Sequence, residues 1–323
     1  MKNTPLTHWI ARGLLAVGAA AATSAHAYPD KVITVIVPFG AGTINDINAR
    51  DFAQVLSVIA KQPVVVENRT GAEGTIGGQA LLSAPADGHT LMFASNSLTV
   101  FDPLMKKSIP YDPVKDIIPV CGAGRTTLLL NASGASPYRT VGDIVAAAKA
   151  QPGKLTFAYS STSTRLSGEL LQQAAGIRLT GVPYRASVAA LTEISGGQVD
   201  LMFIDRVSAA PFYESGKVRP VATSGEQRLK ALPQVATFAE AGLPGVSVQP
   251  WFGLYASGKS TPAVLRQVSE LVGKAVRSPE MAVNAEKRGL EAFTLCGDAL
   301  VKHRAEEMEL WRGVIKKAGI EPQ

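Results

Sequence analysis

Short apolar runs alternate along the chain with longer segments whose apolar residues recur at helical spacing. In the first third, this pattern predicts strands at 32–37, 64–67 and 90–94, with helices over 45–60 and 76–84 between them. A turn, Pro-Ala-Asp-Gly, leads into the third strand. The order strand, helix, strand, helix, strand is typical of a βαβαβ unit with parallel strands.

A proline-broken stretch at 102–119 interrupts the alternation, and a second α/β run follows it. We expect a strand near 125–131 and further strands at 155–159, 178–183, 199–204 and 218–223. Helices are expected at 140–150, 166–175 and 187–195. An apolar strand at 251–255 follows a Gly/Pro-rich segment, and the rest is mostly helical. The sequence therefore predicts an α/β protein with two lobes.

The first 27 residues have the features of a secretory signal peptide. Lys2 and Arg12 occur without any acidic residue, an apolar run covers 13–22, and Ala25-His26-Ala27 is an A-x-A cleavage site. The alternative, a buried first helix, is disfavoured because the segment is not amphipathic. No later stretch approaches the ~20 apolar residues of a transmembrane helix. We expect cleavage after Ala27 and a periplasmic location.

Composition agrees with a globular chain and adds a weak electrostatic hint. The sequence is 46% hydrophobic and 18% charged, which is enough to build a sizeable core. The net charge of +6 includes the two cations of the leader, and no cluster of Lys and Arg interleaves with aromatic residues. This distribution argues against nucleic-acid binding and suits a small acidic ligand.

Two cysteines, Cys121 and Cys296, lie far apart in the sequence. In an oxidising compartment they pair or remain as two buried free thiols, and the sequence leaves both possibilities open.

A glycine-bearing loop between the first strand and the first helix has the features of an anion-binding site. Its backbone N–H groups and the unpaired amides of the helix's first turn point to one spot, where the helix dipole also favours negative charge. Glycine permits close approach, and a Thr or Asn side chain can cap the helix. The candidate ligand-binding residues are Phe39, Gly40, Ala41, Gly42, Thr43, Asn45 and Asp46.

The strand at 155–159 leads into a run of five hydroxyl residues that begins at Ser160, before the next predicted helix. The alternative is a Ser/Thr-rich capping loop with no ligand. Two such loops in successive α/β lobes favour binding, because open parallel sheets hold ligands beyond the carboxyl ends of their strands. The candidates here are Ser161, Thr162, Ser163, Thr164 and Arg165.

Further candidates are polar residues that follow other strands: Ser95, Asn96, Ser97, Tyr184, Arg185 and Asp205. Each has a structural alternative. The first three are also ordinary turn residues, Arg185 can pair with a surface acid, and Asp205 can form an ion pair with Arg206.

The sequence gives little support for catalysis. Only His89 and His303 remain after the leader, and the nucleophile-elbow, zinc-protease and redox motifs do not occur. A dinucleotide-dependent enzyme is a distant alternative, because Gly40 and Gly42 follow a strand and Glu67 ends the next one. Asn45 stands where the third glycine would be. We therefore expect no enzymatic activity, no cofactor and no metal.

The chain resembles the Bug-type (TctC-like) periplasmic substrate-binding proteins of tripartite tricarboxylate transporters. The resemblance extends over the whole chain after the leader, in order. It is carried by Tyr28-Pro29-Asp30-Lys31, Val37-Pro38-Phe39, Asp46-Ile47-Asn48-Ala49-Arg50, 63–69, 87–91, 110–116, Val182-Pro183-Tyr184-Arg185, 196–203 and Trp251-Phe252-Gly253-Leu254.

The resemblance implies a periplasmic binding protein fold, with two α/β lobes, two crossover strands and a ligand cleft between the lobes. Crossovers near 121–130 and 248–256 imply a first lobe of 28–124 and 252–323 and a second lobe of 125–251. A monomer of this type captures a small carboxylate and delivers it to membrane permease subunits. The alternative is a sensor that reports to a membrane histidine kinase.

The chain departs from the family pattern in the expected cleft. Gly40 and Ala41 replace paired prolines, and Thr43 replaces a second glycine. Arg165 stands where a histidine is common, and the acid that often follows the Met-Phe strand is displaced by one position, to Asp205. The sequence therefore does not identify the carboxylate.

Overall fold

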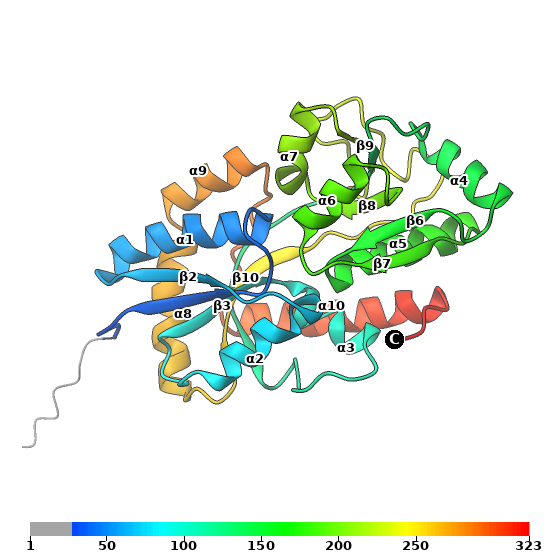
Figure 1. Cartoon of the computed structure of the whole chain (residues 1–323). Helices are drawn as coiled ribbons and strands as arrows, with labels where there is room; N and C mark the ends of the chain where they lie inside the picture. Colours follow the sequence, from blue (N-terminus) through cyan, green and yellow to red (C-terminus); the bar gives the residue numbers. More distant parts are fainter. Residues whose placement is uncertain (1–27, 323) are drawn as a thin grey trace, which may run out of the picture.

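The computed structural model describes residues 28–322, so the expected signal peptide lies outside the described residues. The chain forms two α/β lobes, each built on a five-stranded sheet (Figure 1). In Figure 1 the blue, cyan, orange and red elements and the yellow strand β10 make up the first lobe, and the green elements make up the second. The C-terminal part of the chain thus returns to the lobe in which the described chain begins. Between residues 28 and 322 no helix is both long and apolar enough to cross a membrane.

The first sheet has the strand order β2-β1-β3-β10-β4. Strands β1, β2 and β3 are parallel, as the βαβαβ pattern predicts, and β10 runs antiparallel between β3 and β4. The strands are β1 (Ile33–Val37), β2 (Val64–Asn68), β3 (Thr90–Ser95), β4 (Ile117–Arg125) and β10 (Trp251–Ser257). The helices of this lobe are α1 (Ile44–Ala60), α2 (Thr75–Ser83), α3 (Asp102–Met105), α8 (Pro262–Val276), α9 (Pro279–Arg288) and α10 (Asp298–Lys317).

The second sheet has the order β7-β6-β8-β5-β9, with β6, β7 and β8 parallel and β5 antiparallel to both of its neighbours. Its strands are β5 (Leu129–Ser133), β6 (Thr156–Tyr159), β7 (Thr180–Pro183), β8 (Leu201–Ile204) and β9 (Val218–Thr223). Its helices are α4 (Val141–Ala150), α5 (Thr162–Ala175), α6 (Ser187–Ser195) and α7 (Arg206–Glu214).

The structure differs from the sequence-based prediction at three places near the crossing and the helix starts. The strand expected near 125–131 is two strands, because β4 ends at Arg125, β5 begins at Leu129, and the chain passes between the sheets at 126–128. Helix α7 was not predicted, since its nine residues include Pro211. Helix α5 begins at Thr162, four residues before its predicted start, because the Ser161 hydroxyl caps its first turn.

Apolar side chains on α1 and β1 show why these elements form. In α1, Ala49, Phe52 and Leu56 are buried and lie on one face at helical spacing, while β1 is an apolar strand. The Phe52 ring packs 6.3 Å from that of Phe93 in β3. Burial of a large side chain such as Phe52 or Leu56 stabilises the fold by about 1.5–3 kcal/mol. The helix therefore lies rigidly over the sheet, and its first turn is held at the β1 carboxyl end.

The first turn of α5 contacts the first lobe through a buried polar cluster. The Thr162 hydroxyl donates to the carboxylate of Asp102, which also forms an ion pair of 2.8 Å with Lys106. The Arg165 guanidinium donates to the Met105 carbonyl oxygen at 2.6 Å. We call these residues the α3–α5 latch. The latch holds the two lobes together on one side of the space between them.

Two other hydroxyls also bridge the lobes. Ser97 donates to the Ser163 hydroxyl at 2.9 Å, and the Ile44 backbone N–H donates to the Ser208 hydroxyl at 3.0 Å. The second bond connects the first turn of α1 with the first turn of α7, so the starts of two helices from opposite lobes lie within one hydrogen bond of each other.

A disulfide between Cys121 and Cys296 resolves the alternative that the sequence left open. Cys121 lies in β4, and Cys296 lies just before α10. The adjacent backbone bond from Gly122 N–H to the Leu295 carbonyl is 2.8 Å. The disulfide therefore attaches the segment before α10 to the edge strand of the first sheet, across a sequence separation of 175 residues.

Removing this disulfide should destabilise the protein. We expect Cys296→Ser to lower the free energy of unfolding by about 2–4 kcal/mol, because a closed loop restricts the unfolded chain. Urea denaturation measures the change. Wild-type protein in reductant should unfold like the variant, and reductant should leave the variant unchanged. A wild-type midpoint unaffected by full reduction would contradict the prediction.

The buried carboxyl of Asp102 makes stability depend on pH. Burial raises the pKa of Asp102 to about 6, against the opposing effects of the Lys106 ion pair and the Thr162 hydrogen bond. In the unfolded chain the ordinary pKa is about 3.9. The folded protein therefore binds a proton between pH 4 and 6 that the unfolded chain does not. Ionised Asp102 costs stability above pH 6, and this cost disappears as the pH falls toward 4.

The variant Asp102→Asn removes this titration. The free energy of unfolding of the variant minus that of the wild type should therefore rise as the pH increases from 4.5 to 7, as measured by urea denaturation. Asp143→Asn is the control, because the Arg139 and Thr140 backbone amides lower the Asp143 pKa and place its titration below this range. A difference for Asp102→Asn that stays flat or falls would refute the assignment.

Candidate ligand-binding site between the lobes

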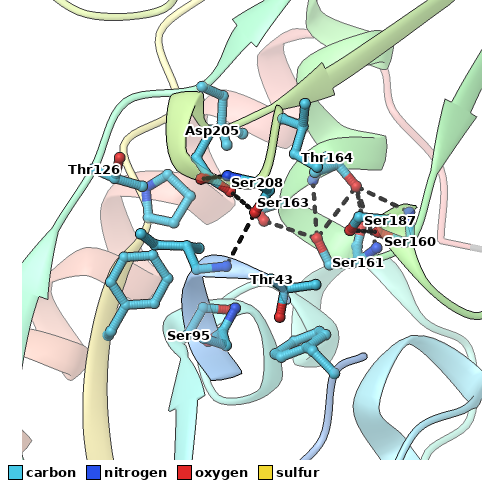
Figure 2. A pocket seen from close by; sticks show the side chains of 17 residues that line it. Thr43, Ser95, Thr126, Ser160, Ser161, Ser163, Thr164, Ser187, Asp205 and Ser208 are labelled. Carbon is cyan, nitrogen blue, oxygen red and sulfur yellow. Dashed lines mark hydrogen bonds between the residues drawn. The ribbon is translucent and has the colours of Figure 1, made fainter. Parts of the chain in front are cut away.

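A small cavity lies between the lobes and is lined by residues of both (Figure 2). Its volume is about 40 Å³, and one buried water needs roughly 10–15 Å³ on this scale. In Figure 2 the labelled hydroxyl groups of both lobes surround the same space. The lining residues are Phe39, Thr43, Ile44, Asn45, Ser95, Thr126, Leu128, Ser160, Ser161, Ser163, Thr164, Ser187, Ile204, Asp205, Ser208, Pro250 and Phe252.

Four helices begin at this cavity, one from the first lobe and three from the second. Thr43 caps α1, Ser161 caps α5 and Asp205 caps α7 through their side chains. Helix α6 begins after Ala186, which has no capping side chain. The first-turn amides and the dipoles of these helices create a positive potential in the cavity. The arrangement favours an anion held mainly by backbone N–H groups.

Among the 17 lining residues, Asp205 is the one with an ionisable side chain. Ten others carry a hydroxyl or amide side chain: Thr43, Asn45, Ser95, Thr126, Ser160, Ser161, Ser163, Thr164, Ser187 and Ser208. The cavity therefore holds charge through dipoles and neutral donors instead of cationic side chains. The lining also includes the apolar residues Phe39, Ile44, Leu128, Ile204, Pro250 and Phe252.

Asp46 holds the first loop in place through contacts outside the cavity. Its carboxylate accepts the Gly42 N–H at 3.0 Å and the Asn68 side-chain amide at 3.0 Å, and it forms an ion pair of 2.9 Å with Arg50. Burial raises the pKa of Asp46, but these three partners together outweigh burial and hold it below its usual range. Asp46 does not line the cavity. Its role is to fix the loop that does.

The glycine segment of the first loop also stays outside the cavity lining. Ala41 and Gly42 are exposed, and Gly42 has φ +77°, a value that favours glycine. Gly40 lies against the second lobe, where an added Cβ would come within 3.0 Å of the Cβ of Ala186. These residues shape the turn and allow the lobes to approach. Of the first-loop candidates, Phe39, Thr43 and Asn45 line the cavity.

The hydroxyl run of the second lobe divides between two roles. Ser161, Ser163 and Thr164 line the cavity, and the neighbouring Ser160 hydroxyl lies 2.7 Å from that of Ser187. Thr162 and Arg165 instead form the α3–α5 latch. Because α5 begins at Thr162, residues three apart lie on one helix face, and this face points toward α3. Arg165 therefore does not line the cavity.

The remaining candidates also divide. Ser95 lines the cavity, whereas the Asn96 amide donates to Glu307 of α10 at 2.9 Å and Ser97 bridges the lobes. Tyr184 packs beside the second lobe's apolar cluster, and Arg185 is exposed. Neither of these last two residues lines the cavity.

Asp205 lies in the cavity because β8 ends one residue earlier, at Ile204. Its two carboxylate oxygens accept the backbone N–H and the hydroxyl of Ser208, both at 2.8 Å. Burial raises the pKa of Asp205, and the two bonds from Ser208 oppose that shift. Because Ser208 also accepts the Ile44 N–H, a continuous chain of hydrogen bonds runs from Asp205 to the first turn of α1.

Several lining residues were not candidates in the sequence analysis: Ile44, Thr126, Leu128, Ser160, Ser187, Ile204, Ser208, Pro250 and Phe252. Ser160 and Ser187 stand in stretches that the sequence identified as hydroxyl-rich, so a broader selection would have included them. Ser208 was missed because α7 was not predicted. Thr126 and Pro250 lie where the chain passes between the sheets, and only the expected crossovers pointed there.

Comparison with known proteins assigns the family. The family model described as "Tripartite tricarboxylate transporter family receptor" (TctC) matches residues 48–320. Protein BugT of Bordetella pertussis is 31% identical over 322 residues, which cover 99% of each chain. A UPF0065 protein from the tcbD-tcbE intergenic region of Pseudomonas sp. strain P51 is 32% identical over 90% of this chain and 87% of the relative.

Solved structures show the same fold. The R. palustris protein Rpa4515 with adipate has a TM-score of 0.85 and 29% identity, covering 92% of this chain and 100% of that one. MatC from Rhodopseudomonas palustris with bound malate has a TM-score of 0.80 and 27% identity, covering 89% and 100%. These relatives are solute-binding proteins and not enzymes, as the sequence analysis predicts for this chain. The chain therefore belongs to the TctC family of tripartite tricarboxylate transporter receptors, which includes the Bug proteins.

Proposed function

We propose that this protein is a periplasmic receptor that captures a small organic acid between its lobes and delivers it to the permease of a tripartite tricarboxylate transporter. The observation that carries the proposal is the convergence of four helix N-termini on one cavity lined by hydroxyl groups. A carboxylate placed there accepts hydrogen bonds from amides and hydroxyls of both lobes.

Two relatives support the choice of ligand class. Their structures contain adipate and malate, both carboxylates, in the fold that this chain shares. The lining of the present cavity suits such a group because its donors are neutral and fixed, so a carboxylate is held without a competing buried cation. The residues we assign to ligand contact are those candidates that line the cavity: Phe39, Thr43, Asn45, Ser95, Ser161, Ser163, Thr164 and Asp205.

Binding requires movement of the lobes. A volume of about 40 Å³ has room for a few atoms, which is less than a four-carbon acid needs. We propose a hinge closure between a first lobe of 28–124 and 252–323 and a second lobe of 125–251, with the crossings at 126–128 and near Pro250 as hinges. The ligand stabilises the closed form because it contacts both lobes there.

Export and delivery complete the proposal. Residues 1–27 act as the signal peptide, and the mature chain is a periplasmic monomer. The description of the family model as a transporter receptor supports a permease as the partner. The closed form, in which the lobes' relative position is fixed by the ligand, is the form that permease subunits recognise.

Ligand capture is testable without knowing the ligand. Native mass spectrometry of the purified mature protein should detect a co-purifying acid, and a thermal-shift screen of mono-, di- and tricarboxylates should find acids that raise the melting temperature with concentration. Matched amides of the same acids are the control and should have no effect. If no carboxylate in the screen shifts the melting temperature, the proposed function is wrong.

Loss of the Ser161 hydroxyl should weaken ligand binding in addition to lowering the stability of the fold. Ser161→Ala removes the α5 cap and a donor in the cavity, so we expect about 1 kcal/mol lower stability and roughly tenfold weaker binding of the acid found in the screen. Thr140→Ala is the matched control, because Thr140 caps α4 with the same kind of capping box outside the cavity. It should lose similar stability with unchanged affinity in isothermal titration calorimetry. Equal affinity in both variants would contradict the assignment.

A further inference from the structure

Two side-chain groups in the cavity lining accept hydrogen bonds but cannot donate them: the Asp205 carboxylate and the Asn45 amide oxygen. Asp205 is 4% exposed and Asn45 is 8% exposed, and both line the cavity. The hydrogen bond from Ile44 to Ser208 connects them, because Ile44 precedes Asn45 and Ser208 holds the Asp205 carboxylate. We call Asp205 and Asn45 the acceptor corner.

The charge of Asp205 exceeds what helix capping needs. Thr43 and Ser161 cap α1 and α5 with neutral hydroxyls, and α6 begins without a capping side chain. Serine caps a helix about as well as aspartate does. A neutral residue at 205 would therefore complete α7 and leave the cavity uncharged, which would suit a ligand that carried nothing but carboxylates. The carboxylate instead makes one corner of the cavity negative.

Asn45 provides an independent observation. Within residues 28–322 its side-chain oxygen Oδ1 is buried and has no hydrogen-bond partner. A buried acceptor without a partner costs about 1–3 kcal/mol relative to a satisfied one. A donor from a bound molecule removes this cost, and a carboxylate oxygen does not, because it is an acceptor itself.

We infer that the ligand carries, besides its carboxylate, a hydroxyl or ammonium group that donates to the acceptor corner. This inference rests on the proposed function and narrows it to hydroxy acids and amino acids. The ligand carboxylate lies at the N-termini of α1, α5 and α6. The hydroxyl or ammonium group lies beside Asp205, whose negative charge strengthens the hydrogen bond that it accepts.

The same corner disfavours acids that lack a donor. Such an acid leaves the Asn45 Oδ1 without a partner and places no donor beside the Asp205 carboxylate, so it binds more weakly. Specificity of this kind arises from the unsatisfied groups of the site, and it exceeds the discrimination that an apolar pocket achieves for a single substituent.

Two matched sets of acids test the inference on the wild-type mature protein. One set is propionate, lactate and alanine, and the other is succinate, malate and aspartate. Within each set the members differ by hydrogen, hydroxyl or ammonium at one carbon. Isothermal titration calorimetry should show binding that is about ten- to a hundredfold tighter for the hydroxy or amino member than for the parent acid of the same set. Comparison of the two donors tells hydroxyl from ammonium.

The variant Asp205→Asn separates specificity from helix capping, because asparagine caps as well as aspartate and carries no charge. We expect it to reduce the preference for the donor-bearing member to less than about threefold, mainly by weakening that member. Ser161→Ala is the control and should weaken all members of a set alike. If Asp205→Asn does not fold by circular dichroism, Asp205→Ser provides the same test.

Two results would overturn the inference. One is a parent acid that binds as tightly as its hydroxy and amino derivatives, which would leave the proposed carboxylate receptor intact. The other is an unchanged preference in Asp205→Asn, which would reduce Asp205 to a helix cap. Failure of all six acids also refutes the inference, and the broader carboxylate screen then decides the proposed function separately.

Discussion

The structure depends on a conflict between like partial charges. Helix N-termini from opposite lobes face one another across a cavity of about 40 Å³, and each brings amides that lack a helical partner. The lobes meet there because hydroxyls and one carboxylate lie between the helix ends. The hydrogen bonds that run from the Ile44 amide through the Ser208 hydroxyl to the Asp205 carboxylate compensate the partial positive charges of the α1 and α7 N-termini. In the proposed function, a ligand carboxylate would provide the same compensation for the other helix starts.

Two of the buried carboxyl groups, Asp102 and Asp205, are stabilised by different kinds of partner. Asp102 has a cationic partner in Lys106 and a hydroxyl from the second lobe, whereas Asp205 has the hydroxyl and amide of Ser208. Burial raises the pKa of both carboxyl groups. Asp102 links the lobes outside the cavity, and Asp205 is the one ionisable side chain among those that line it.

Sequence periodicity was sufficient for most of the architecture and insufficient for the details of the site. The buried strand β1 and the amphipathic helix α1 can be predicted from the sequence, because burial of a whole face imposes an apolar pattern on many residues. The cavity does not impose such a pattern. Whether Thr162 or Ser163 faces it depends on the residue at which α5 begins, and a capping hydrogen bond decides that start. Ser208 depends on a short proline-containing helix whose local signal is weak.

The first turn of α5 has one face on the cavity and the other on the latch, with Ser163 and Thr162 adjacent in the chain. These neighbours cannot move independently, because both belong to one rigid turn. In the proposed receptor, a ligand held at Ser163 would therefore be coupled to the contact of Asp102 with Thr162, and by reciprocity the ligand would stabilise that contact. Under the proposed function, residues that do not touch the ligand, such as Asp102 and Lys106, would then contribute to its residence time.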